Sequence, residues 1–387
     1  MVGSMNETIY MPVGEVCSSI SDTYREKKNM VTLINTSDVL EGRVLNHERV
    51  PNSSLKGQFK KTFQRDDILY SEIRPQNRRF AYVDFSPIDY IASTKLMVIR
   101  AKKDVVSPKY LYYFLKNSST VAELQLLAET RSGTFPQITF SEVANLTIPV
   151  PPLAVQEVIV QTMQCLEDKT ICNEQINDNL QQQAMALYAE MFLNSSDNNV
   201  TSGTLSDIAV ITMGQSPSGS SYNEDGVGEV FYQGRAEFGF RFPKRRLFTT
   251  EPKRMAETGD VLLSVRAPVG DLNVAYESCC IGRGLGAIHS KTGHSSFVLY
   301  TMFALKSQLD VFNGEGTVFG SINRDALNAI PIDVPLVTKI DRFEAVAHPI
   351  DELIRTNYEE NCRLEAIRDS LLPKLMSGEI DVSAVQL

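Results

Sequence analysis

The stretch Ser132 to Ile138 (SGTFPQI), continued by Leu146 to Pro151 (LTIPVP), decides the fold because the chain carries a second copy of it. The second copy reads GTVFGSI from Gly316 to Ile322 and IPIDVP from Ile330 to Pro335. Equivalent residues of the two copies lie 184 positions apart. A repeat of this length predicts a duplicated domain, because solenoid repeats are much shorter.

Each copy of the duplication predicts a module of mixed strands and helices. The stretches Asp67 to Ser71 (DILYS) and Asp260 to Ser264 (DVLLS) are strand-like and lie 193 positions apart. Each leads to a loop that contains proline, RPQN from Arg74 to Asn77 and RAPVG from Arg266 to Gly270. Helix-like stretches follow in both copies. The mixture predicts an α+β module in each half of the chain.

A long helix is predicted after each module. Apolar residues recur every seven positions from Ile159 to Leu187 and from Phe343 to Leu371. Such seams predict two helices that pack on each other as a coiled coil. Pro349 lies inside the second seam, and we expect it to kink the helix or to delay its start.

Two asparagines interrupt each seam at equivalent positions. A polar residue on a seam costs stability but fixes the register of the helices. We therefore expect a shared polar layer where the helices cross. The alternative is that these side chains tolerate solvent on loosely packed helices. The four residues are Asn173, Asn177, Asn357 and Asn361.

These patterns predict four domains along the chain. The first module spans 1–152 and the central helix 153–194. The second module spans 195–336, after a polar linker at 194–199, and the distal helix and tail span 337–387.

Composition indicates an ordinary globular protein in a reducing compartment. Hydrophobic residues make up 43% of the chain, and no apolar run approaches the roughly 20 residues that a membrane span needs. The six cysteines show no C-x-x-C spacing, so neither disulfides nor a zinc site are expected. We therefore expect a cytoplasmic protein without membrane contact.

The distribution of charge points to nucleic acid, although the net charge is −9. Basic residues exceed acidic ones by four in 56–79 and again in 235–266. The helical segments 154–197 and 337–381 are acidic instead, at −6 and −4. Two basic stretches at similar places in a duplication favour DNA binding. The alternative is that any acidic protein carries some basic loops.

The candidate DNA-binding residues come from these two basic stretches. Arginine and lysine hold phosphates, and arginine, asparagine and glutamine also read base edges. The alternative for each one is a solvated side chain. In the first module the candidates are Lys60, Lys61, Arg74, Gln76, Asn77, Arg78 and Arg79; in the second they are Gln233, Arg235, Arg241, Lys244, Arg245, Arg246 and Arg266.

Motifs for catalysis are not found in the sequence. The only paired prolines, Pro151 and Pro152, lack the polar and aromatic neighbours that an adenine methyltransferase needs. No G-x-x-x-x-G-K-[ST] phosphate loop occurs, and Gly282 to Gly286 fits a tight turn better than a nucleotide cradle. No catalytic residue, metal ligand or cofactor is therefore assigned to this chain.

The architecture and the ending RDSLLPKLMSGEI, from Arg368 to Ile380, resemble the specificity (S) subunit of type I restriction-modification enzymes. IGRGLGAI from Ile281 to Ile288 and GDVLLSVRAPVG from Gly259 to Gly270 are similar to stretches of that family's target-recognition domains. The first module has no counterpart of the run from Gly282 to Ala287.

The resemblance implies an α+β fold with two similar α/β target-recognition domains. Two long antiparallel helices would separate them as a coiled-coil spacer, with pseudo-two-fold symmetry. Each domain would read one half of a split sequence in double-stranded DNA. The helices would dock two methyltransferase (M) subunits, which bind S-adenosylmethionine, and restriction (R) motor-nuclease subunits would join them. The chain itself would catalyse nothing.

A second hypothesis is a non-enzymatic, two-headed adaptor that binds protein or glycan. DNA affinity that falls steeply with salt would favour DNA recognition, because each neutralised phosphate releases counterions. A third, a stand-alone methyltransferase, predicts that this chain alone binds S-adenosylmethionine.

Overall fold

A computed structural model of the chain describes residues 8–26, 28–52, 57–131, 135–194, 200–266, 268–313 and 320–382. The fold consists of two compact units. Unit 1 comprises Met1–Ile171 and Asn361–Leu387, and unit 2 comprises Cys172–Glu360. Residues 195–199 of the linker predicted at 194–199 and the stretch from Ser132 to Thr134 lie outside the described residues, as do Lys56 and 314–319.

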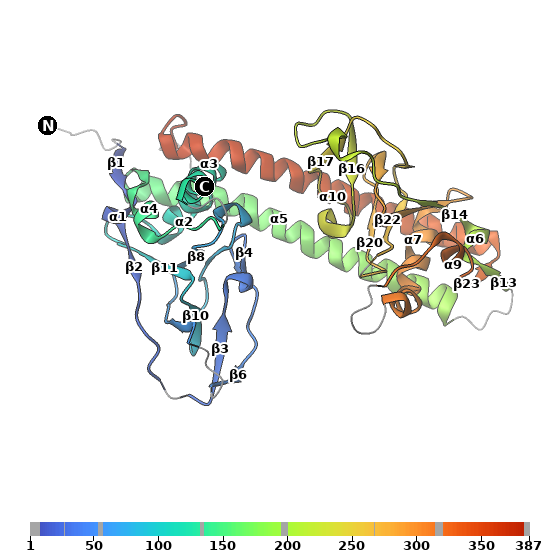
Figure 1. Cartoon of the computed structure of the whole chain (residues 1–387), viewed down its shortest axis with the longest axis horizontal. Coiled ribbons are helices and arrows are strands. Elements are labelled where there is room, and N and C mark those ends of the chain that lie inside the picture. Colours follow the sequence, from blue (N-terminus) through green and yellow to red (C-terminus); the bar gives the residue numbers. More distant parts are fainter. Residues whose placement is uncertain are drawn as a thin grey trace. The chain divides into compact units, whose positions relative to one another are not determined.

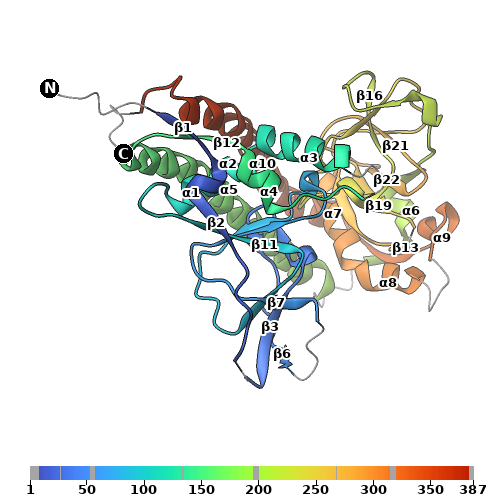
Figure 2. The same ribbon diagram turned by 60° about the vertical axis from the view of Figure 1, so that its left-hand side comes forward.

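Unit 1 contains two four-stranded sheets and a two-stranded ribbon. In Figure 2, the sheet that contains β3 (Met30–Ile34) and β6 (Val50–Pro51) extends away from helices α1 (Val13–Val16), α2 (Pro108–Lys116) and α4 (Phe140–Asn145). The first sheet has the order β2 (Cys17–Ile20), β11 (Leu96–Ala101), β8 (Ile68–Ser71), β9 (Phe80–Tyr82). The second has the order β6 (Val50–Pro51), β3 (Met30–Ile34), β10 (Tyr90–Ser93), β7 (Phe59–Lys61), and the ribbon pairs β1 (Ile9–Pro12) with β12 (Thr147–Val150). A small hairpin joins β4 (Val39–Leu40) to β5 (Arg43–Val44), and the helices are α1 (Val13–Val16), α2 (Pro108–Lys116), α3 (Ser118–Arg131) and α4 (Phe140–Asn145).

Unit 2 is built in the same way from different residues. Its first sheet has the order β14 (Ala209–Met213), β22 (Leu285–Ser290), β19 (Val261–Ser264), β20 (Leu272–Val274). Its second has the order β15 (Tyr222–Asn223), β17 (Leu247–Thr249), β16 (Glu229–Tyr232), β21 (Cys279–Ile281), β18 (Met255–Ala256), and its ribbon pairs β13 (Val200–Thr204) with β23 (Pro331–Pro335). The helices are α6 (Leu205–Ile208), α7 (Ser295–Ala304), α8 (Lys306–Asp310) and α9 (Arg324–Asn328).

The strand orders confirm the duplication. The sheet β2-β11-β8-β9 is repeated as β14-β22-β19-β20, antiparallel throughout. Each second sheet contains a single parallel pair, β3 with β10 and β16 with β21. The core of each module lies where α2 or α7 covers its first sheet, with Tyr110 and Tyr300 fully buried. The central strands of the first sheets are apolar on both faces, because alternate residues enter two different cores: Ile68 and Tyr70 of β8 lie in one cluster and Leu69 in another.

Two long helices complete the fold, α5 (Leu153–Tyr188) and α10 (Val337–Ser377), and Figure 1 shows both. Five residues of π-helix, Ala189–Leu193, extend α5. In unit 1, Met163 of α5 shares a core with Leu372 of α10. In unit 2, Ala184 of α5 shares a core with Phe343 of α10. Residues early in α5 therefore meet residues late in α10, so the helices run antiparallel, as predicted.

The expected effect of Pro349 on the start of the helix is wrong. Helix α10 begins at Val337 and continues through Pro349. Proline removes one hydrogen bond to the carbonyl four residues earlier. The fully buried Phe343, Ala347 and Ile354 lie on both sides of it. Their packing stabilises the helix enough to offset the lost bond.

The seam asparagines make buried polar contacts. In unit 2, Asn357 donates from Nδ2 to Oδ1 of Asn177 over 2.8 Å, and Asn173 donates to Glu360 over 2.7 Å. In unit 1, Asn361 donates to the carbonyl of Thr170. Asn173 is 0% exposed and Asn357 9%, so the solvent-tolerance alternative does not hold for these two. Their role in fixing the register stays a prediction.

Candidate nucleic-acid interface

Two loops at equivalent positions of the first sheets carry several of the predicted DNA-binding residues. One connects β8 to β9 and spans 72–79, and the other connects β19 to β20 and spans 265–271; we call them the proline loops. Each follows a strand that begins beside a buried aspartate. Asp67 accepts two hydrogen bonds of 2.7 Å from the guanidinium of Arg100, and Asp260 contacts Nδ1 of His289 at 2.6 Å. These pairs anchor the strands from which the loops project.

The environment of Asp260 affects its charge. Burial raises the pKa of Asp260, although the backbone N–H of Glu257 and the neighbouring His289 act in the opposite direction. The pKa of Asp66, the residue before the buried Asp67 in unit 1, is shifted in the opposite direction. Burial acts to raise its pKa, but hydrogen bonds from Lys103 and Tyr82 give a net lowering.

In the first module, the proline loop displays most of its predicted residues. Arg74, Gln76 and Asn77 are exposed, and a short 3-10 turn, Pro75–Asn77, holds them close together. Arg74 and Arg78 have positive φ values of 43° and 51°, unusual for residues other than glycine. Such strained backbone at a surface loop suggests a functional constraint.

Two other predicted arginines of this loop hold it to its neighbours. Arg78 donates to the hydroxyl of Ser118 at the start of α3, over 2.9 Å. Arg79 donates to the carbonyl of Ser37 over 3.0 Å. A hollow of about 390 Å³ lies between the loop residues Gln76 and Arg78 and the side of α3. The loop therefore borders a concave surface that carries polar groups.

The two predicted lysines lie on the other sheet of unit 1. Lys60 is exposed on β7. Lys61 directs its ammonium group to the carbonyls of Thr94, at 3.1 Å, and Leu96, at 2.7 Å. Burial lowers the pKa of Lys61, although Glu72 partly opposes this. The structure thus does not place these lysines on the proline loop, and Lys61 has partners within the protein.

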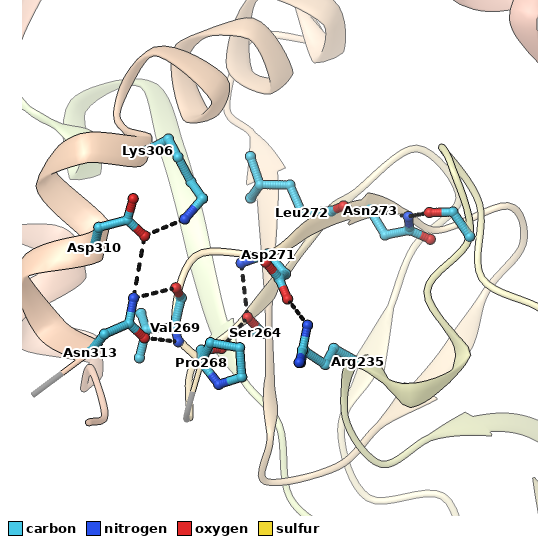
Figure 3. A network of polar contacts seen from close by, with 11 residues as sticks. Arg235, Ser264, Pro268, Val269, Asp271, Leu272, Asn273, Lys306, Asp310 and Asn313 are labelled. Carbon is cyan, nitrogen blue, oxygen red and sulfur yellow. Dashed lines mark hydrogen bonds and ion pairs between the residues drawn. The ribbon is translucent and has the colours of Figure 1, made fainter. Parts of the chain in front are cut away.

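In the second module, three predicted arginines form surface ion pairs. Arg235 pairs with Asp271, as Figure 3 shows; Arg245 pairs with Glu277, and Arg246 with Glu237. Their side chains remain 51–55% exposed. The hydrogen bonds that Arg245 donates to Glu277 raise the pKa of Arg245. The pairs of Arg235 and Arg245 have about one third or more of each side chain exposed and contribute only about 0–1 kcal/mol, so a phosphate group can replace their carboxylates. Glu237 is only 5% exposed, so losing Arg246 would leave a buried carboxylate without this partner.

The remaining predicted residues of this module are exposed. Gln233 and Arg266 lie next to β16 and β19, and Lys244 lies between β16 and β17. Arg266 forms an isolated strand bridge with Ser321 at the base of its proline loop. Within the described ranges, the side-chain ends of Lys244 and Arg266 form no ion pair.

Arg241 is a correction to the predicted set. It is 4% exposed and pairs with Asp351 of α10 at 2.8 Å and with Gln181 of α5 at 3.0 Å. Its guanidinium also lies over the ring of Tyr300. A charge buried this completely needs fixed partners, so Arg241 secures the second module on the helices and is removed from the candidates.

Carboxylates at equivalent positions fasten both modules to the long helices. In unit 1, Glu167 of α5 accepts hydrogen bonds from Tyr113 (2.9 Å) and from Lys116. In unit 2, Asp351 of α10 accepts from Tyr300 (2.9 Å) and from Arg241. Glu167 and Asp351 are 184 positions apart, the offset of the duplication. Each module is therefore attached to the helix that follows it in the chain.

Sequence reasoning missed the side chains that hold the proline loops from beneath. Gln125 of α3 accepts a hydrogen bond from the backbone N–H of Gln76. Asn313, which follows α8, accepts one from the backbone N–H of Val269. Both amides are distant in sequence from their loops, and no local motif marks them.

Features of other functional classes are not found in the described part of the chain. It contains no group of three or more His, Cys, Asp or Glu residues that could hold a metal ion. Among the described helices, none combines the length and apolar character needed to cross a membrane.

Comparison with known proteins gives consistent matches. The model of the type I restriction modification DNA specificity domain matches residues 9–182. The putative type I restriction enzyme MjaX specificity subunit of Methanocaldococcus jannaschii is 29% identical over 337 residues, covering 82% of this chain and 79% of its own. The type I restriction enzyme HindI specificity subunit of Haemophilus influenzae is 28% identical and covers 90% and 94%. A chain from a structural study of complex assembly and conformational transition of the type I R-M system aligns over 96% and 98%, with 25% identity and a TM-score of 0.50.

Proposed function

This chain belongs to the family of type I restriction-modification specificity subunits, and on that premise we propose that it reads a bipartite DNA target. As a specificity subunit, it is a non-catalytic DNA-recognition component. In the proposal, each module reads one half of the target. The helices α5 and α10 dock two methyltransferase subunits, which bind S-adenosylmethionine, and restriction motor-nuclease subunits complete the complex in the cytoplasm.

One observation carries the proposal. Two modules with the same strand order each present a proline loop at the end of an equivalent strand. The exposed residues differ, with Arg74, Gln76 and Asn77 on the first loop and Arg266 on the second. Two modules with the same scaffold but different exposed loop residues can each read a different base sequence. Together they suit a DNA target whose two halves differ.

The proposal is tested by expressing the chain with its methyltransferase subunit in a host that lacks other adenine methylation. Single-molecule sequencing of the host chromosome then maps modified adenines. The expected result is one bipartite motif with a modified adenine in each half. A single continuous motif, or no motif despite an assembled complex, would contradict the proposal.

A further inference from the structure

The two proline loops are each pinned at their bases by an isoleucine and a serine. Ile138 donates its backbone N–H to the carbonyl of Glu72 over 2.9 Å, and Ile322 donates to Val265 over 3.1 Å. The hydroxyl of the preceding serine also binds loop backbone in both modules. Ser71 accepts from the N–H of Ile73, and Ser264 accepts from the N–H of Asp271. The isoleucine contact is thus equivalent in the two loops, whereas the serine binds the start of the first loop and the end of the second.

A second contact holds each loop further out, at the residue after the proline. The N–H of Gln76, which follows Pro75, donates to Oε1 of Gln125 over 3.2 Å. The N–H of Val269, which follows Pro268, donates to Oδ1 of Asn313 over 2.5 Å. Asn313 also donates from Nδ2 to the carbonyl of Val269 over 3.2 Å, and Figure 3 shows both bonds. Ala267 of this loop lies outside the described residues.

The amides that make these contacts are themselves fixed. Gln125 is 7% exposed, and its Nε2 donates to Glu129 over 2.7 Å, which sets the orientation of the amide. Asn313 donates to Asp310 over 3.2 Å, and Asp310 in turn pairs with Lys306. An amide with a fixed orientation presents its oxygen in one place, whether it is buried, as Gln125 is, or half-buried, as Asn313 is, so it restrains the loop backbone.

The two amides come from the same part of each module but from different secondary structure. They lie 188 positions apart, between the offset of 193 at the strands before the loops and the offset of 184 from Ile138 onward, and Gln125 lies in helix α3 whereas Asn313 lies in the 3-10 turn Val311–Asn313. The same contact is therefore made in both modules. This points to the contact itself as what each module needs.

We propose that Gln125 and Asn313 are positioning residues for DNA recognition, each setting the backbone of one proline loop. This rests on the proposed function. The backbone is held from beneath while Arg74, Gln76 and Asn77, or Arg266, project into solvent. A loop ordered before binding loses less conformational entropy on binding. It also presents base-reading groups at defined angles. Gln125 and Asn313, which we call the clamps, therefore act on discrimination between DNA sequences more than on overall DNA affinity.

The test uses the complex of the full chain with its methyltransferase subunit, and the probe is the host chromosome read for modified adenines. Gln125→Leu and Asn313→Leu are compared with wild type. Each is expected to lower methylation of the wild-type motif about ten-fold, the loss expected for one buried hydrogen bond, and to relax the motif in one half only. The two variants should affect opposite halves.

Gln308→Leu is the matched control, because Gln308 is an exposed amide in α8 whose side chain makes no hydrogen bond to the described residues of the loop. Asn313→Gln keeps both the acceptor for the N–H of Val269 and an amide donor for its carbonyl, and should restore discrimination if Asn313→Leu folds poorly. An unchanged motif in both clamp variants, with wild type methylating a bipartite site, would overturn this inference alone. Absence of any motif in wild type would instead overturn the proposed function.

Discussion

Asp260 and Asp66, one in each module, should change the stability of the protein in opposite ways as pH changes. The pKa of Asp260 is raised above its ordinary 3.8, so folding disfavours its charged form, and its contribution to stability falls as pH rises above about 3.8. The pKa of Asp66 is lowered, so its contribution is present above 3.8 and is lost as pH falls through its folded pKa.

We therefore expect Asp260→Asn and Asp66→Asn to differ on the two sides of pH 3.8. The free energy of unfolding of wild type relative to Asp260→Asn should fall as pH rises above 3.8. Relative to Asp66→Asn it should be constant above 3.8 and should fall as pH drops below it. Urea unfolding at a series of pH values measures both differences. Parallel curves for the two variants would show that the environments described for these carboxyls are wrong.

Arg241 provides a second test at this scale. Arg241→Ala leaves Asp351 and Tyr300 without their shared partner in a buried site. We expect a loss of about 3–5 kcal/mol in the free energy of unfolding, typical of breaking a buried ion pair. Lys244→Ala, at an exposed position three residues on, should change it by less than about 0.5 kcal/mol. Equal effects in a urea titration would contradict the burial of Arg241.

At the scale of elements, the pairing of α5 with α10 carries a prediction about register. Replacing both Asn177 and Asn357 with leucine removes a buried polar pair and adds apolar contact. We expect higher stability but less defined register, because a seam asparagine discriminates against shifted alignments. The single change Asn357→Leu should lower stability, because it leaves Asn177 buried without this partner.

Spin labels at Gln182 and Glu352, both exposed within unit 2, measure the register directly. A double electron–electron resonance experiment should give one narrow distance distribution for wild type and a broader one for the double leucine variant. An unchanged distribution in the double variant would remove the support for a register role.

Elements were also where sequence reasoning succeeded most. The 184-residue offset predicted two similar modules, and the heptads predicted two long helices, because apolar periodicity reports packing directly. The delayed start expected at Pro349 was wrong, because tertiary packing outweighs a local propensity there, while a kink stays a prediction. Sequence reasoning also failed at Arg241 and for the clamps Gln125 and Asn313, since burial and long-range hydrogen bonds leave no local pattern in a sequence.

At the scale of the whole molecule, existing ion pairs should shape the response of DNA binding to salt. Arg235 and Arg245 must exchange Asp271 and Glu277 for phosphate, whereas Lys244 and Arg266 have no carboxylate to displace within the described residues. We expect Lys244→Ala and Arg266→Ala each to reduce the slope of log affinity against log salt by about 0.9. Arg235→Ala and Arg245→Ala should reduce it less.

Fluorescence anisotropy with a duplex of random sequence, across a salt series and with the assembled complex, measures these slopes. Arg324→Ala in α9 is the control, because it removes an exposed arginine outside the candidate set. Identical slopes for all variants would favour the alternative of a two-headed adaptor for protein or glycan.

The attachment of each module to its own following helix has a consequence for evolution and engineering. Glu167 lies 14 residues into α5, and Asp351 lies 14 residues into α10. A recombination crossover at the start of either helix would separate a module from its carboxylate. In such a chimera, Lys116 of the first module would face the shorter side chain of Asp351. In this chain Asp351 binds Arg241 and Tyr300 of the second module. Productive chimeras should therefore carry at least the first four turns of helix with each transplanted module, so that the inherited unit is longer than the reading domain itself.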